Sequence, residues 1–336
     1  MNKILLPIAA VALLAACSEN NTDANFAAPQ PGVASSSSEA IGTPVDQSSS
    51  STEVVVPPEV SSSSEAVVPP VELSSSSAAS EFTYSVPTLT EINPNYAYTF
   101  YGAELTGVEH FKYGRFEARM KMASISGSVS SMFLNYDNSW MKEYEPWNEI
   151  DIEILGKNPN EWQSNIITRE GDPSINKTTT SEVVHPFDYD ATKEFHLYAI
   201  VWTPEYVSWE IDSVEVRRDI LGGSHGTHAD ADQVAFLTEE QSLRFNLWAS
   251  KTPSWTGKFT GIGLPIEQQI DYVRVYSYDE ATKGFTLSWQ DDFDGEDIDP
   301  QHWTVGDWEM ENVWYRGQNI KVQNGVCRII MDYEAN

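Results

Sequence analysis

The stretch Trp147-Asn148-Glu149-Ile150-Asp151-Ile152-Glu153-Ile154 decides how this chain of 336 residues can fold. From Glu149 onward, acidic residues alternate strictly with isoleucines. Such alternation is typical of a β-strand, in which successive side chains point to opposite faces. The stretch therefore predicts a strand with Glu149, Asp151 and Glu153 on one face and three isoleucines, suited to a core, on the other.

Three carboxylates on one strand face are close enough to influence one another. Successive members lie about 6.6 Å apart at Cα, and Glu149 and Glu153 lie roughly 13 Å apart, from a rise of about 3.3 Å per residue. Like charges at this spacing raise at least one pKa when they are partly desolvated, which separates an acid from a base.

This separation of pKa values is what glycoside hydrolysis needs. Retaining glycosidases hold two carboxyl groups about 5–5.5 Å apart, and inverting ones about 6.5–9.5 Å apart. Two glutamates that lean toward each other over Asp151 can close most of the gap, so the geometry permits the retaining distance. The alternative is an exposed strand whose acidic face is solvated.

Composition limits the class of partner. The chain has 20 basic and 50 acidic residues and a formal net charge of -30. This charge argues against nucleic acid and against anionic membrane surfaces as partners, and it favours a neutral ligand. The eleven tryptophans and fifteen tyrosines are many for one domain. Some can stack on sugar rings, although most are expected in the core.

The N-terminus has the pattern of a bacterial lipoprotein signal. Lys3 precedes an apolar run, and Leu14-Ala15-Ala16-Cys17 resembles the bacterial lipobox, in which the cysteine is lipidated. The apolar run is shorter than the about 20 residues that a membrane-spanning helix needs. We expect residues 1–16 to be removed and Cys17 to anchor the protein in the cell envelope, at the outer membrane or cell surface. The alternative is an ordinary secretory signal.

Residues 17–80 predict a disordered linker. Runs of four serines begin at Ser35, Ser48, Ser61 and Ser74, with Pro, Val, Glu and Ala between them. This composition buries too little apolar surface to offset chain entropy. A flexible chain of this length reaches roughly 40–45 Å, enough to hold a domain away from a membrane.

Residues 81–336 predict a single all-β domain. Short alternating runs separated by turn residues favour a β-sandwich or barrel, and no long stretch has helical periodicity. The clearest runs are residues 114–120, 195–202, 206–211, 244–248 and 272–276.

The sequence of residues 149–153 matches the E-[IV]-D-[IV]-E signature of glycoside hydrolase family 16, and the chain resembles the family's 1,3-1,4-β-glucanase (lichenase) branch. The resemblance runs from about residue 81 to the end. It implies an antiparallel β-jelly-roll sandwich with a cleft on its concave face. Supporting matches lie at residues 101–105, 113–120, 163–165, 202–204, 244–248 and 273–276.

The order of the matching segments is unusual. Residues 285–294, 299–303 and 319–331 look like the usual beginning of this family, but they follow what is usually its last strand. The chain therefore resembles a circularly permuted member, with residues 279–284 joining the old ends. Permutation is tolerated where termini lie close together at a surface.

The resemblance assigns the roles at the site. It implies that Glu149 is the nucleophile, that Glu153 is the general acid/base and that Asp151 tunes the pair. It further implies a monomeric, retaining endo-β-glucanase that hydrolyses mixed-linkage 1,3-1,4-β-glucan without a cofactor. The expected substrate contacts are the aromatic residues Phe133, Trp248, Trp255 and Trp308 and the polar residues Glu104, Gln163, Asn165, Arg244 and Asn246.

One position departs from the family pattern. The family has a tyrosine two residues after the position of Phe133, where this chain has Asn135 followed by Tyr136. Either the cleft has lost this tyrosine, or a one-residue bulge between Asn135 and Asn138 brings Tyr136 into its place.

The resemblance also implies a structural calcium site. Asp271, Asp292 and the backbone of Gly325 match such a site in the permuted branch, and oxygen ligands suit calcium. The alternative is a pair of solvated surface aspartates. The histidines lack the spacing of a zinc site. Cys327 lies in an apolar run and is expected to be a buried small hydrophobe.

Two other functions remain open from the sequence. The same fold can act on laminarin, xyloglucan or a galactan, although laminarinase-like members usually insert a residue into the acidic signature. A carbohydrate-binding lipoprotein without turnover is the second alternative, and the complete carboxylate triplet argues against it.

Overall fold

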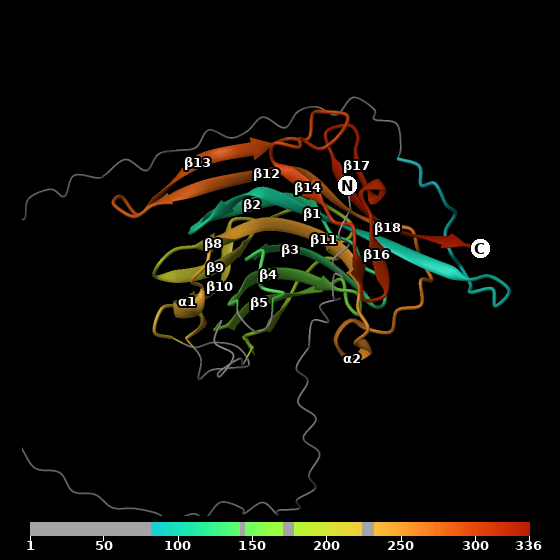
Figure 1. Cartoon of the computed structure of the whole chain (residues 1–336), viewed down its shortest axis with the longest axis horizontal. Coiled ribbons are helices and arrows are strands. Elements are labelled where there is room, and N and C mark those ends of the chain that lie inside the picture. Colours follow the sequence, from blue (N-terminus) through green and yellow to red (C-terminus); the bar gives the residue numbers. More distant parts are fainter. Residues whose placement is uncertain (1–81, 142–144, 171–177, 224–231) are drawn as a thin grey trace, which may run out of the picture. The chain divides into compact units, whose positions relative to one another are not determined.

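The computed structural model describes residues 82–141, 145–170, 178–223 and 232–336 (Figure 1). The predicted signal peptide, Cys17 and the predicted linker lie outside these residues. Within the described ranges, no helix is long and apolar enough to cross a membrane.

The described residues form mainly strands, with three short helical turns: α1 (Gln233–Phe236), α2 (Pro253–Thr256) and the 3-10 turn η1 (Gly317–Asn319). The strands are β1 (Tyr98–Phe111), β2 (Gly114–Lys121), β3 (Ser128–Asn135), β4 (Trp147–Leu155), β5 (Glu161–Arg169), β6 (Thr179–Thr180), β7 (Val183–Pro186), β8 (His196–Trp202), β9 (Tyr206–Ile211), β10 (Val214–Ile220), β11 (Gln241–Ala249), β12 (Ile266–Asp279), β13 (Gly284–Asp291), β14 (Trp303–Val305), β15 (Glu309–Met310), β16 (Val313–Tyr315), β17 (Ile320–Val322) and β18 (Cys327–Ala335).

The first sheet carries the acidic strand β4 as an inner strand. Its strands pair antiparallel in the order β14–β1–β11–β3–β4–β5–β7. The register sets Glu153 opposite Ser131 on one side and Gln163 on the other. Ser131 in turn lies opposite Asn246, and Asn246 opposite Glu104. One row across five strands therefore presents polar side chains on a single face.

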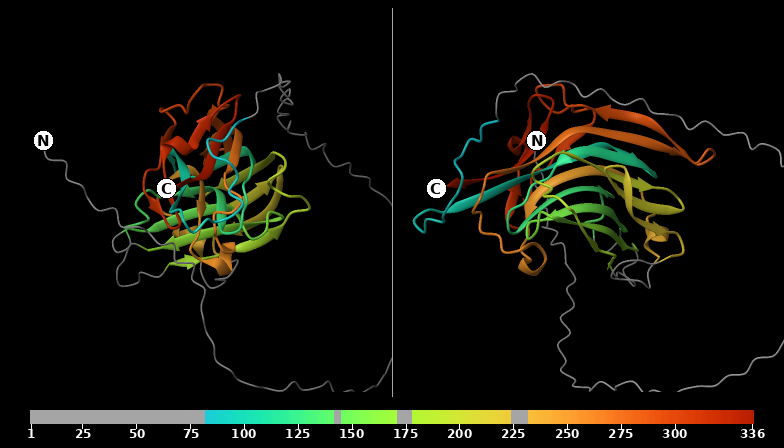
Figure 2. Two further views of the ribbon diagram at one scale, coloured as in Figure 1. Left: turned by 90° about the vertical axis from the view of Figure 1, so that its right-hand side faces the viewer. Right: turned by 180° about the vertical axis from the view of Figure 1, so that it is seen from behind.

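The second sheet packs behind the first. Strands β12, β2, β8, β9 and β10 pair antiparallel in that order, and the other edge of β12 is covered by β18 and β13. The late segments of the chain therefore complete both sheets, because β14 pairs with β1 of the first sheet. Figure 2 shows the strands of the domain curving in the same direction.

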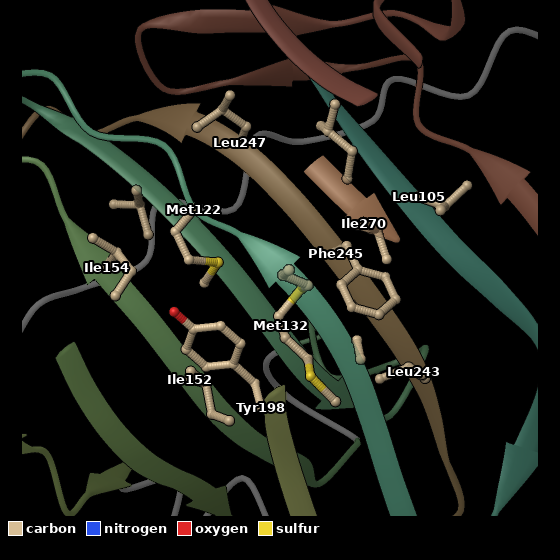
Figure 3. Packing of buried hydrophobic residues seen from close by; sticks show 14 of the residues in the cluster. Leu105, Met122, Met132, Ile152, Ile154, Tyr198, Leu243, Phe245, Leu247 and Ile270 are labelled. Atoms are coloured by element: carbon tan, nitrogen blue, oxygen red, sulfur yellow. The ribbon is translucent and has the colours of Figure 1, made fainter. Parts of the chain in front are cut away.

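The core lies between the two sheets. Ile150, Ile152 and Ile154 of β4 are fully buried and join one hydrophobic cluster with residues of β2, β8 and β12. Figure 3 shows Ile152 with Tyr198 of β8 and Met132 of β3 nearby. The isoleucine face of the acidic strand thus supplies the core, as its alternation predicts.

The predicted antiparallel β-sandwich is confirmed. Strands occupy each of the five runs identified from alternation, although β12 extends beyond the predicted residues 272–276 on both sides. Cys327 is buried, as predicted for a small hydrophobe.

Truncation of a core isoleucine tests the packing. Ile152→Ala removes buried apolar atoms and leaves a cavity, so we expect the free energy of unfolding to fall by about 2–5 kcal/mol. Ile220→Ala is the matched control, because this side chain on β10 is 50% exposed; its effect should stay within about 0.5 kcal/mol. Urea unfolding measures both. Equal losses for the two variants would contradict a core centred on β4.

Candidate active site

The three carboxylates of β4 lie at the floor of a cleft of about 620 Å³. Glu149, Asp151 and Glu153 keep only 7%, 3% and 8% of their surface exposed. The alternative of a solvated acidic face is therefore wrong. The cleft is lined by Glu104, Ser131, Phe133, Asn135, Asp137, Ser139, Trp140, Trp147, Glu149, Asp151, Glu153, Arg244, Asn246, Trp248, Asp307, Trp308, Glu309, Met310 and Trp314.

Glu149 has the strongest support for its anion. Burial raises its pKa to about 7, while hydrogen bonds from Trp147 and Asp151 act in the opposite direction. Trp147 Nε1 donates to Glu149 Oε2 at 2.5 Å. Because Glu149 accepts hydrogen bonds from two neighbours, its anion is stabilised more than the anions of the other two carboxyl groups.

Glu153 favours the protonated form. Burial, followed by the charge of Glu149, raises its pKa to about 8. Gln163 on the neighbouring strand β5 donates from Nε2 to Glu153 Oε2 at 2.9 Å. At neutral pH this carboxyl group therefore holds a proton that it can transfer, which suits a general acid.

Asp151 is influenced by the two glutamates on the cleft side and by a hydrogen bond to its backbone on the core side. Burial and the charges of Glu149 and Glu153 raise its pKa well above the ordinary range. From the core side, Trp209 Nε1 donates to the backbone oxygen of Asp151 at 2.9 Å. A protonated Asp151 can donate to Glu149, so it lowers the negative charge that the site must hold while supporting that anion.

A second polar group occupies β1 and β11 beside the carboxylates. Arg244 Nη1 lies 3.2 Å from Glu104 Oε1, and its Nη2 lies 2.5 Å from Asp137 Oδ1. Asn246 Nδ2 donates to Glu104 Oε2 at 3.3 Å, and Ser131 Oγ donates to Asn246 Oδ1. The positive charge of Arg244 also offsets part of the rise in pKa that burial causes at Glu149. This network holds the polar side chains in fixed directions toward the cleft.

The predicted substrate contacts divide into two groups. Six line the cleft: Glu104, Phe133, Arg244, Asn246, Trp248 and Trp308. The other three do not line it: Gln163 and Asn165 lie on β5 opposite Glu153 and Asp151, and Trp255 contacts Gln163. Gln163 contacts Glu153 and accepts from Trp255 Nε1 at 3.3 Å, and Asn165 accepts from the backbone of Ser181 at 2.9 Å.

At the position that departs from the family pattern, Asn135 lines the cleft and Tyr136 does not. The β3–β4 register runs without a shift to Asn135 opposite Glu149, and the backbone N–H of Tyr136 donates to the Asn148 oxygen. Regular pairing turns Tyr136 to the other side, where its hydroxyl donates to Glu145 at 2.9 Å. Of the two alternatives, the structure therefore favours the one in which the cleft lacks this tyrosine.

Several lining residues were missed from the sequence. Ser131 and Trp147 lie two residues from Phe133 and Glu149, so strict alternation along their strands places them on the cleft face. That signal could have found both. The remaining residues come from connections or from short strands far away in the sequence, where alternation gives no direction: Asp137, Ser139, Trp140, Asp307, Glu309, Met310 and Trp314.

The two aspartates predicted to bind calcium both have arginine partners in this structure. Asp271 Oδ2 accepts from Arg119 at 2.6 Å, and Asp292 Oδ1 lies 3.6 Å from Arg274. A Cβ on Gly325 would lie 4.0 Å from the Asp292 backbone oxygen, so these two segments are neighbours. Calcium takes six to eight oxygen ligands, and both carboxylates here face arginines. Calcium binding at this place stays a prediction.

The antiparallel sandwich and its carboxylate-floored cleft define a protein of the glycoside hydrolase type. The sequence profile of Glycosyl hydrolases family 16 matches residues 72–274, and the chain belongs to this family.

The chain is also similar to individual proteins. The Beta-glucanase of Fibrobacter succinogenes (strain ATCC 19169 / S85) is 45% identical over 233 residues, which cover 68% of this chain and 62% of the relative. The Beta-glucanase of Brevibacillus brevis is 30% identical over 179 residues, 53% of this chain and 61% of the relative. The chain thus spans less than two thirds of the length of either. A solved Bacillus licheniformis beta-glucanase aligns with a TM-score of 0.41 at 25% identity, covering 51% of this chain and 69% of that one.

The raised pKa of Glu153 makes stability depend on pH. Because its folded pKa of about 8 lies above the ordinary 4.5, the folded state binds more protons than the unfolded state between these values. The free energy of unfolding should therefore fall as pH rises from about 5 to 8. Glu153→Gln, which cannot ionise, should remove part of this fall, on the order of 1 kcal/mol or more.

Urea unfolding at pH 5 and pH 8 measures this difference. Glu309→Gln is the control, because this carboxylate lines the same cleft but is exposed. A pH dependence that is the same in wild type and Glu153→Gln would show that Glu153 ionises as freely when folded as when unfolded.

Proposed function

We propose that this protein is a retaining endo-β-glucanase that hydrolyses mixed-linkage 1,3-1,4-β-glucan. The observation that carries the proposal is the buried row of three carboxylates on β4, in which Glu149 has donors for its anion and Glu153 holds a proton. Double displacement needs these two states side by side. The names of the two beta-glucanase relatives support the substrate class.

In the first step, the Glu149 carboxylate attacks the anomeric carbon and the glycosidic C–O bond breaks. Glu153 gives its proton to the leaving oxygen, so that the departing chain leaves as a neutral alcohol. A covalent glycosyl-enzyme forms with the anomeric centre inverted once. Glu149 loses its negative charge when it becomes part of the glycosyl-enzyme. The pKa of Asp151 then falls, because one of the charges that raise it is gone.

In the second step, the ionised Glu153 takes a proton from a water molecule that attacks the same carbon. The bond to Glu149 breaks, and the centre is inverted again, which restores the original configuration. Trp147 Nε1 and Asp151 then stabilise the released Glu149 anion. No cofactor is required by this sequence of proton transfers.

The alternatives differ in a measurable way. Laminarin, xyloglucan and galactan would use the same carboxylates, so product analysis on these polymers and on barley β-glucan decides the linkage. A non-catalytic binding protein would not need acid groups held in different protonation states. The complete row of carboxylates therefore favours an enzyme.

We also infer that the domain is circularly permuted. The family profile ends at residue 274, whereas β13, β14 and β18 follow it and pair with β12 and β1 inside the same sandwich. The short turn between β12 and β13 supports a join at residues 279–284.

The stereochemistry of the product tests the mechanism. Proton NMR of a fresh β-glucan digest should show the β-anomer first, because two inversions give net retention. Glu149→Gln and Glu153→Gln should each lower the rate by at least about 100-fold with unchanged circular dichroism. An initial α-anomer would mean that water attacks directly and that Glu149 is not a nucleophile.

For the location, we propose a lipid anchor on Cys17 that holds the monomeric enzyme at the bacterial cell envelope. The supporting observation is the sequence pattern of Lys3, the apolar run and Leu-Ala-Ala-Cys. Cys17→Ser should move the protein from the membrane pellet to the soluble fraction, as followed by immunoblot. Ser18→Ala is the adjacent control and should remain in the pellet. If Cys17→Ser still pellets with the envelope, the anchor is not at this residue.

A further inference from the structure

Two tryptophans are more exposed to solvent than the other nine. All eleven tryptophans lie within the described residues, and nine of them are buried or half-buried. Trp140 and Trp314 are 50% and 44% exposed, and both line the cleft. An indole offers a large apolar surface, and leaving it in water is unfavourable unless a ligand covers it.

We propose that Trp140 and Trp314 form two outer subsites that stack on uncharged hexosyl residues of a polysaccharide, at opposite ends of the carboxylate row. This inference rests on the proposed function and adds the residues that select a long chain over a short one.

The strand register places the two indoles apart. Trp140 follows the end of β3, beyond Asn135, which lies opposite Glu149. Trp314 pairs with Tyr101 of β1, three residues before Glu104, and Glu104 shares a row with Glu153. Because β1 and β3 run in the same direction, Trp140 lies past the Glu149 end and Trp314 past the Glu153 end.

The distance across the sheet supports outer positions. Three strand spacings separate β4 from β1, roughly 14 Å. A sugar that covers Trp314 is therefore not the one that reacts at Glu149. It belongs to a unit farther along the same polymer, as an endo-acting cleft requires.

The faces of both rings are available. Trp314 is held by its edge, because Nε1 donates to Asp307 Oδ1 at 2.8 Å. Across the described part of the chain, neither Trp140 nor Trp314 has an aromatic or cationic stacking partner, whereas the cleft residue Trp308 packs against Tyr315. A ring fixed by its edge loses little freedom when a sugar covers its face.

The charge of the cleft identifies the kind of sugar. Asp137, Asp307 and Glu309 line it in addition to the buried carboxylates. Arg244 is the single basic residue among the described lining residues, and it is already paired with Glu104 and Asp137. A sulfated or uronic acid polymer would meet uncompensated negative charge. Neutral hexosyl units avoid this repulsion and offer hydroxyl donors to the carboxylates.

Trp140→Ala and Trp314→Ala test the two subsites. On barley β-glucan, we expect each variant to raise KM about fivefold to tenfold with little change in kcat, since an aromatic anchor is lost from binding alone. The loss should be smaller on the shortest gluco-oligosaccharide that the wild type cleaves. Trp314→Phe keeps an aromatic face and should restore most of the affinity. Tyr96→Ala, an exposed aromatic residue outside the cleft, is the matched control.

The outcomes separate the two proposals. If the wild type cleaves β-glucan but both alanine variants keep its KM on the polymer, the outer subsites are wrong and the proposed function stands. Equal losses on the polymer and on the shortest oligosaccharide would also overturn the subsites, because an outer residue cannot contact a short substrate. A wild type that hydrolyses no β-glucan overturns both proposals.

Discussion

Burial of three acids on one strand is the constraint on which the rest of the site depends. Isolated carboxylates at this depth would be strongly unfavourable as anions. The opposite face of the same strand offsets part of this cost, because Ile150, Ile152 and Ile154 are fully buried. Each such side chain contributes about 1.5–3 kcal/mol. β4 is therefore a strand whose core face stabilises the fold and whose cleft face is held in a state that costs stability.

The site limits this cost by keeping most of its protons. Glu153 and Asp151 have raised pKa values, and Glu149 is supported by Trp147 and Asp151. One negative charge shared over the group is easier to bury than three. The same distribution of protons is the one that the proposed double displacement needs, so the arrangement that makes burial tolerable also suits this chemistry.

The side chains that line the cleft change in character with their distance from β4. Close to β4, the network of Glu104, Asn246, Arg244 and Ser131 fixes polar groups that can orient a sugar. Farther out, Trp140 and Trp314 expose apolar faces. This arrangement is consistent with the proposed long neutral polymer, in which only one linkage reacts while many units contribute to binding.

Several features of this protein follow from the sequence alone. Strict alternation predicted β4, its buried isoleucines and the common face of Glu149, Asp151 and Glu153, because side-chain direction in a strand depends only on position parity. Alternation in other runs predicted further strands and the antiparallel sandwich. The same rule reaches Trp147 and Ser131, which share strands with recognised residues.

Other features were decided by tertiary structure. The depth of the carboxylates, and hence their pKa values, depends on the sheets and loops that cover them and not on their spacing. The regular β3–β4 register turned Tyr136 away and put Asn135 in the cleft, a choice between two pairings that local sequence left open. Trp140 and Trp314 entered the cleft from a connection and from a short strand beside β1. Their directions are set by long-range pairing, which no local periodicity encodes.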